Sequence, residues 1–169
     1  MASRRLSGFN FVGRVGYNAV MKVITKSTNE TQALAKLFGK ELLAHSTLMK
    51  RAMVVALRGE LGAGKTTFSQ GFARGLGVRE KIKSPTFVIL KSYKLKAKSR
   101  FKHFYHIDCY RLKSAKDTRS IGLSEILKNP ENLVLIEWPE RIKNILSKKQ
   151  IIAIKFSHID ETSRKISFN

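Results

Sequence analysis

The stretch of sequence that decides the fold is Met53-Val54-Val55-Ala56-Leu57-Arg58-Gly59-Glu60-Leu61-Gly62-Ala63-Gly64-Lys65-Thr66. Its first part is a short, continuous apolar run, which is typical of a strand buried on both faces of a parallel sheet. Its second part matches the pattern Gly-x4-Gly-Lys-Thr, and residues 65–76 then predict a helix stopped by Gly75 and Gly77. A strand, a glycine-rich loop and a helix in this order predict a phosphate-binding P-loop.

The P-loop also predicts how a nucleotide is held. Its glycines let the backbone turn tightly enough for successive amides to face a phosphate, and the following helix supplies the positive end of its dipole. Lys65 is expected to reach the β and γ phosphates, and Thr66 to ligate Mg²⁺, so the expected cofactors are ATP and Mg²⁺. The expected contacts within the loop are Gly62, Ala63, Gly64, Lys65, Thr66 and Thr67.

Two acids follow other apolar runs. Glu137 comes directly after Leu133-Val134-Leu135-Ile136, and Asp108 closes the run of residues 104–107. A P-loop enzyme needs an acid near its metal, usually at the carboxyl end of a neighbouring buried strand. Either acid alone is also compatible with a surface carboxylate at a strand end. The presence of both beside one P-loop favours a catalytic centre.

The rest of the chain predicts an α/β P-loop fold with three layers, a mostly parallel central sheet and antiparallel hairpins at its margin. Helical spacing of apolar residues predicts a helix over residues 30–43 behind the capping candidates Thr28 and Asn29, and a short helix over residues 121–127. Residues 87–95 with 101–107, and residues 151–156 with 165–168, predict two hairpins. One domain, residues 21–169, accounts for all of these elements.

The formal net charge of +21 favours contact with polyanions, although a solvated lysine-rich surface explains it equally well. Basic residues alternate through the first predicted hairpin, and period two would place those within each strand on one face, where they could follow a phosphate backbone. A merely solvated face remains the alternative. These residues are Lys94, Lys96, Lys98, Arg100 and Lys102.

Residues 1–20 are basic, contain no acid and are expected to be disordered; an upstream start codon or an appended segment is the preferred explanation, with a transit peptide as the alternative. The single cysteine, Cys109, fits a reducing compartment, and cytoplasm is the expected location. The longest apolar run of the interior, Ala52 to Leu57, is far shorter than the roughly 20 residues of a membrane-spanning helix. We therefore expect no membrane segment.

Several ring-bearing residues lie close to the acids in the sequence. His103 and His106 are three residues apart, which on a strand points them to opposite faces, so we expect packed or solvent-facing side chains rather than a metal pair. Tyr110 and Trp138 are compatible with stacking on a partner or with core packing.

Four motifs, taken together, resemble one known family. They are the P-loop with Thr67-Phe68, then Ser84-Pro85-Thr86-Phe87, His106-Ile107-Asp108-Cys109-Tyr110-Arg111-Leu112 and Glu137-Trp138-Pro139-Glu140. In this order and spacing they closely resemble the TsaE (YjeE) family over residues 21–168. The resemblance implies an ATPase required for threonylcarbamoylation of adenosine 37 in tRNAs that read codons beginning with A. It also implies TsaD-like and TsaB-like protein partners, with direct or indirect contact to tRNA.

The resemblance implies roles for individual residues as well. Thr66 and Glu137 would ligate Mg²⁺, Asp108 would be catalytic together with Lys65, and the Ser84-Pro85-Thr86 segment would be a switch-like loop near the γ phosphate. Thr31 and Arg164 would be outlying nucleotide contacts. The chain departs from the family in its basic extension, its excess of lysine, and the segment Lys116-Asp117-Thr118-Arg119-Ser120, where the family is usually acidic.

Two other functions remain open at this stage. A small-molecule or nucleotide kinase uses the same P-loop but needs an acceptor pocket and usually an arginine-bearing lid, and the sequence has no convincing lid insert. A basic RNA-binding protein that holds nucleotide only as a structural ligand would show no turnover. A GTPase is not expected, because no Asn-Lys-x-Asp motif occurs.

Overall fold

The computed structural model of this protein describes residues 21–45, 50–80, 82, 89–96, 98–112, 115–146 and 151–169. The basic extension of residues 1–20 and the switch-like segment Ser84-Pro85-Thr86 lie outside the described residues, so those two predictions stay untested. Within the described ranges, no helix has both the length and the apolar character needed to cross a bilayer.

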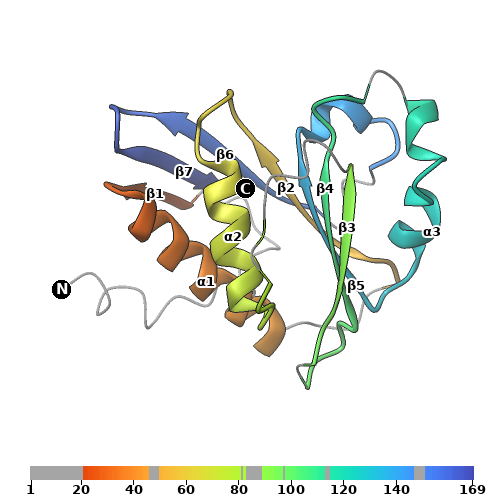
Figure 1. Cartoon of the computed structure of the whole chain (residues 1–169). Helices are drawn as coiled ribbons and strands as arrows, with labels where there is room; N and C mark the ends of the chain where they lie inside the picture. The colour runs from red at the N-terminus through yellow and green to blue at the C-terminus, as the bar shows by residue number, and fades with distance from the viewer. Residues whose placement is uncertain are drawn as a thin grey trace.

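The described strands form one mixed sheet in the order β1-β7-β6-β2-β5-β4-β3 (Figure 1). The central strands β6, β2, β5 and β4 run parallel, while β3 pairs antiparallel at one edge and β7 and β1 do so at the other. The predicted α/β fold, with a parallel centre and antiparallel hairpins at its margin, is confirmed. The strand bounds are β1 Met21–Thr25, β2 Met53–Arg58, β3 Leu90–Lys94, β4 His103–Asp108, β5 Asn132–Glu137, β6 Ile151–His158 and β7 Arg164–Phe168.

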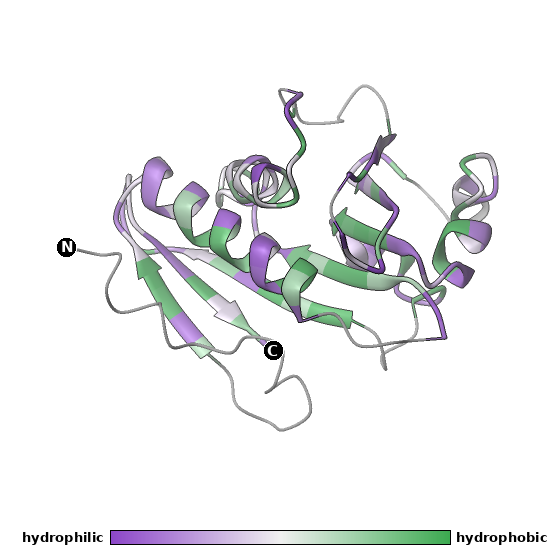
Figure 2. Cartoon of the chain, turned by 90° about the horizontal axis from the view of Figure 1, so that it is seen from below, coloured by the Kyte–Doolittle hydropathy of each residue, from purple (hydrophilic) through white to green (hydrophobic). Residues whose placement is uncertain are grey.

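Helices cover the two faces of the sheet unequally. Helices α1 (Thr28–Ala44) and α2 (Lys65–Gly75) lie side by side over one face (Figures 1 and 2). Helix α3 (Leu123–Lys128) and the short 3₁₀ helices η3 (Ala115–Thr118) and η4 (Pro139–Ile142) lie beside the β2-β5-β4 part of the sheet. Each layer has its own buried apolar cluster, because alternate residues of a strand point to opposite faces.

Helix α1 begins earlier than predicted. Its N-cap is Ser27, in extended conformation, and not Thr28 or Asn29. The Ser27 hydroxyl accepts a hydrogen bond from the Glu30 amide at 3.2 Å, and the Glu30 carboxylate accepts one from the Lys26 amide at 2.8 Å. These bonds satisfy amides at the start of the helix, which explains the earlier boundary.

Glycines on α2 let the two long helices approach closely. A methyl group at Gly71 would overlap the carbonyl oxygen of Gln32 and lie 2.7 Å from its Cα, and one at Gly75 would lie 3.0 Å from the carbonyl carbon of Lys36. Because such contacts are too short for a real Cβ, this packing requires glycine at both positions. The close contact fixes how α2, whose first turn follows the P-loop, packs against α1.

Only one of the five alternating basic residues, Lys94, lies on a strand; Lys102 was expected within the second strand and lies just before it. Strand β3 ends at Lys94 and β4 begins at His103, so Lys96, Lys98, Arg100 and Lys102 lie on the connection between the two strands. The Arg100 guanidinium instead lies 4.3 Å from the centre of the neighbouring Phe101 ring. Period two does not apply to a connection, so these residues share no strand face.

Candidate nucleotide-binding site

The predicted P-loop joins β2 to α2 in the structure. Gly59 has φ +150°, and a side chain there would lie 2.8 Å from the Phe156 carbonyl oxygen. Gly64, the N-cap of α2, has φ +97°, which favours glycine, and no side chain caps the helix. The first turn of this 11-residue helix therefore presents its amides and its positive dipole end toward the loop, as phosphate binding requires.

Lys65 is folded back onto the loop that it follows. Its ammonium donates hydrogen bonds to the carbonyl oxygens of Gly59 at 2.8 Å and Glu60 at 2.7 Å, and lies 4.0 Å from the centre of the Trp138 ring. Burial lowers the pKa of Lys65, and nearby carboxylates, Glu137 foremost, oppose that shift. The ammonium is thus held at the cradle by bonds that phosphate oxygens can replace.

The carboxylate of Glu137 is buried beside the start of α2, with only 2% of the residue exposed. One oxygen, Oε2, accepts a hydrogen bond from the Thr66 hydroxyl at 3.3 Å. The other, Oε1, accepts from Ser69 Oγ at 2.8 Å and lies 2.9 Å from His106 Nε2. Burial alone would raise the pKa of Glu137, but the hydrogen bonds from His106 and Ser69 and the charge of Lys65 outweigh burial and lower the pKa. Glu137 is therefore a carboxylate at neutral pH.

Asp108 lies next to Glu137 at the same edge of the sheet. Each acid ends its strand, as the sequence predicted, and the parallel β4–β5 register pairs the two residues at the same level. Asp108 is 6% exposed, and its Oδ1 accepts a hydrogen bond from the Tyr110 amide at 2.9 Å. A cavity of about 220 Å³ opens here. It brings together Lys65, Thr66, Asp108, Tyr110, Glu137 and Trp138.

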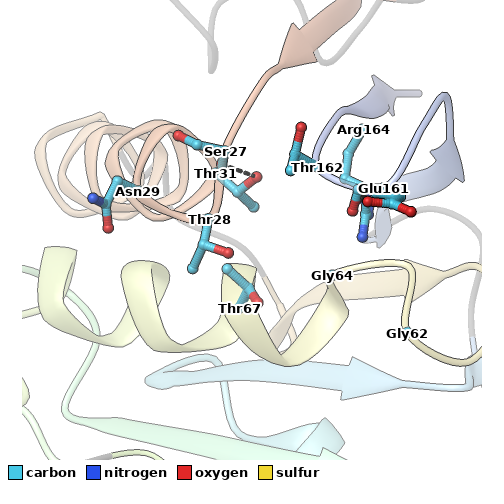
Figure 3. Close-up of a pocket in the computed structure, with 10 residues that line it drawn as sticks. All are labelled: Ser27, Thr28, Asn29, Thr31, Gly62, Gly64, Thr67, Glu161, Thr162 and Arg164. Carbon is cyan, nitrogen blue, oxygen red and sulfur yellow. Dashed lines mark hydrogen bonds between the residues drawn. The ribbon is translucent and has the colours of Figure 1, made fainter.

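A second cavity, of about 390 Å³, lies on the other side of the loop (Figure 3). Figure 3 shows the start of α1 on one side of it, the β6–β7 turn on another, and the first turn of α2 carrying Thr67. Both cavities share Gly62, Gly64 and Thr67, so they meet at the P-loop. The larger one includes Ser27, Thr28, Thr31, Thr67, Thr162 and Arg164.

Thr31 and Arg164, predicted as outlying contacts, both line this larger cavity. The Thr31 hydroxyl lies 2.8 Å from Thr25 Oγ1 and donates to the Ser27 carbonyl oxygen at 3.2 Å, so it also ties β1 to α1. Arg164 Nη1 donates to the carbonyl oxygens of Asp160, Glu161 and Ser163 at 3.0, 3.1 and 3.0 Å. These bonds anchor the guanidinium on the β6–β7 turn at the cavity wall.

His106 is the site residue whose role the sequence did not reveal. It was expected to be packed or solvent-facing, and it is fully buried, but its ring also contacts Glu137. A signal was present, because His106 precedes Asp108 by two residues, which puts both on one face of β4. Tyr110 and Trp138, left open above, pack on each other, with ring centres 5.1 Å apart.

The donor atoms at the smaller cavity suit Mg²⁺. Thr66 Oγ1 and Glu137 Oε2 are neighbouring oxygens, and Mg²⁺ usually binds through one or two protein oxygens, with phosphates and waters completing its shell. In the described part of the chain, no group of three or more His, Cys, Asp or Glu residues gathers as an all-protein metal site. The residues therefore fit a metal that arrives with a nucleotide.

The fold, the glycine-rich loop and the buried acid beside Thr66 define a P-loop nucleotide-binding protein. The model of the family described as "Threonylcarbamoyl adenosine biosynthesis protein TsaE" matches residues 25–166. The chain belongs to this family, TsaE, whose members are P-loop ATPases.

Individual relatives agree with this assignment. The chain is 36% identical over 149 residues to the tRNA threonylcarbamoyladenosine biosynthesis protein TsaE of Bacillus subtilis, a match covering 88% of this chain and 84% of that protein. It is 38% identical over 146 residues to the protein of the same name from Rickettsia felis, covering 86% and 77%. Among solved structures, Bacillus subtilis YdiB matches with a TM-score of 0.65 and 31% identity, covering 89% of this chain and 84% of that one.

Proposed function

We propose that this protein binds ATP with Mg²⁺ and hydrolyses it as a component of the machinery that forms N6-threonylcarbamoyladenosine at position 37 of tRNAs reading A-starting codons. The observation that carries the proposal is the buried Glu137 carboxylate, with one oxygen beside the Thr66 hydroxyl at the first turn of α2. The family of this protein and the names of its relatives support its role in tRNA modification.

In this proposal each part of the site has its own task. The backbone of Gly62, Ala63 and Gly64 cradles the phosphates, and Lys65 exchanges its two carbonyl partners for β and γ oxygens. Thr66 and Glu137 would hold Mg²⁺, which would neutralise phosphate charge when bound. The remaining roles follow from position: Asp108 orients or deprotonates the attacking water, while Thr67, Thr31 and Arg164 border the nucleoside side of the loop.

We further propose that turnover is slow in the isolated chain and is raised by TsaD-like and TsaB-like partners, with tRNA contacted directly or indirectly. Among the described residues lining the smaller cavity there is no arginine to stabilise charge on the transferred phosphoryl group. Two large side chains at its rim are exposed, Leu61 at 76% and Tyr110 at 42%. Exposed apolar side chains around an open site favour coverage by another protein.

The expected domain and location complete the proposal. We assign residues 21–169 to the ATPase domain and residues 1–20 to a basic extension. The single cysteine, which is buried and free, supports a cytoplasmic location.

Removing the Lys65 charge should weaken ATP binding, and Lys65→Ala is expected to raise the ATP dissociation constant by about 10- to 100-fold, the scale of a lost charge-assisted contact. Thr66→Ala should instead weaken the dependence of binding on Mg²⁺. Titration calorimetry of ATP, with Mg²⁺ and with EDTA, measures both effects. If both variants gave the same ATP-binding isotherms as the wild-type protein, the P-loop assignment would be contradicted.

His106 should hold Glu137 in place for the metal. We call the factor by which Mg²⁺ raises ATP affinity the Mg²⁺ coupling. His106→Leu is expected to lower this factor by about 10- to 100-fold, the usual effect of removing a group that orients a metal ligand. ATP affinity in EDTA should change little, because His106 does not line either cavity. His106→Gln, which can still donate to Oε1, is the matched control and should retain part of the coupling. Mg²⁺ titration of nucleotide binding measures the effect, and unchanged coupling in His106→Leu would refute this role.

A further inference from the structure

The sheet has a basic face that the nucleotide site does not use. On β1, β7 and β6, the residues that pack under α1 and α2 alternate with residues that point away from these helices. At the opposite end of the sheet, α3 covers the other face beside β4 and β5 (Figure 1). We call the exposed side chains pointing away from α1 and α2 the outer basic face. Its members are Lys22, Ile24, Arg58, Lys155 and Lys165.

Strand pairing sets these cations in register. In one row across the sheet, Lys22 is paired with Ser167, Ser167 with Lys155, and Lys155 with Arg58. In the next row, Ile24 is paired with Lys165, and Lys165 with Ser157. Neighbouring strands are about 4.8 Å apart, so the first row spans roughly 14 Å.

The charge of this face is not balanced from within. None of the 12 acids of the chain lies on β1, β2, β6 or β7. Lys155 and Arg58 are direct cross-strand partners, and like charges placed opposite one another destabilise a sheet. A repulsive row that is kept exposed is suited to an anionic ligand that neutralises it.

We propose that the outer basic face binds the phosphate backbone of tRNA. The three cations of the first row, spread over roughly 14 Å, can each contact a phosphate along one stretch of an RNA backbone. Lysines and an arginine among small serines give contacts that position a backbone without reading bases. The RNA occupant is favoured over an acidic protein because the family acts in tRNA modification.

This surface is separate from the ATP site. Arg164 and Lys165 are adjacent on β7, but Arg164 lines the nucleotide-side cavity and Lys165 points to the opposite face. Bound tRNA would therefore leave the P-loop accessible, and loss of the tRNA contact would leave ATP binding intact. The proposal thus stands or falls independently of the catalytic roles given to Lys65 and Asp108.

The test is tRNA binding by the full chain, measured by fluorescence anisotropy of an unmodified tRNA transcript between about 50 and 200 mM salt. The variant is Lys155→Gln with Lys165→Gln. The matched control is Lys36→Gln with Lys40→Gln, which removes the same charge from exposed positions of α1. Each lost phosphate contact reduces the magnitude of the slope of log affinity against log salt by about 1, so the double variant should have a slope smaller by about 2. It should also bind tRNA on the order of 10- to 100-fold more weakly at ~0.1 M salt.

The control variant should keep most of the wild-type affinity and slope, and Lys155→Arg with Lys165→Arg should bind like the wild type. All variants should bind ATP normally, which verifies their folding. Equal weakening in the two glutamine variants would show a diffuse charge effect and overturn the proposal. Absence of wild-type tRNA binding would also overturn it, whether or not polyglutamate or anionic vesicles bind.

Discussion

Asp108→Asn is expected to lower kcat for ATP hydrolysis in the assembled system by about 10²- to 10⁴-fold, the usual contribution of a general acid or base. Asp108 ends β4 inside the cavity that holds Lys65 and Thr66. Asp108 Oδ1 accepts a hydrogen bond from the Tyr110 amide. The side-chain oxygen of asparagine can accept the same hydrogen bond, so the local structure should survive. ATP affinity should therefore change little, since a group that acts chiefly in the transition state lowers kcat rather than binding.

Single-turnover hydrolysis and calorimetric ATP binding, measured on the same preparation, separate these two effects. Glu137→Gln is the matched comparison, because it removes the neighbouring acid of the same sheet edge. Glu137 Oε1 lies between the donors Ser69 and His106, so the glutamine oxygen should take that place and turn its NH₂ group toward Thr66. This variant should lose Mg²⁺ coupling. Normal hydrolysis by Asp108→Asn in the assembled system would remove Asp108 from the mechanism.

Local patterns in the sequence predicted the parts of the molecule that depend on neighbouring residues. The run before Gly59, the loop and the helix from Lys65 are contiguous, and strand, turn and helix signals there agree with the structure. The acids Asp108 and Glu137 were found for the same reason, since each directly ends an apolar run. The terminal hairpin was also recognised, although β6 extends to His158.

Contacts between distant segments were not predictable in this way. The bond between His106 and Glu137 requires that β4 pair with β5 in one particular register, which no local pattern specifies. In the outer basic face, Lys22 and Lys155 lie in one row because both strands pair with β7, although the two residues are far apart in the sequence. The exact strand ends were also not predictable, because β3 stops at Lys94 and β4 starts at His103, which leaves Lys102 on the connection and not on a strand face.

The open side of the smaller cavity leads to the largest expected effect. Catalysis of phosphoryl transfer depends on positioning and on positive charge around the γ phosphate. Among the described residues lining the cavity, Lys65 is the cationic side chain, and a Mg²⁺ held by Thr66 and Glu137 would add a second positive charge. Arg111 and Arg141, the nearest arginines to the acids in sequence, are exposed and do not line that cavity. Water reaching an uncovered site also weakens its electrostatic interactions. Both features predict slow hydrolysis until another protein covers the rim formed by Leu61 and Tyr110.

We therefore expect TsaD-like and TsaB-like partners together to raise steady-state ATP hydrolysis by about 10³- to 10⁵-fold if they supply an arginine to the γ phosphate, the range known for such groups. The measurement compares the isolated chain, the chain with purified partners, and the same mixture with tRNA. Leu61→Ser with Tyr110→Ser should reduce the rate with partners by a larger factor than the slow rate of the isolated chain, because the exposed side chains contribute the surface that the partner covers. Lys36→Ser with Lys40→Ser, at exposed positions of α1, is the matched control and should be activated normally. Fast hydrolysis by the isolated chain that no addition changes would reject completion of the site by a partner, and transfer of phosphate to an added small molecule would identify a kinase instead.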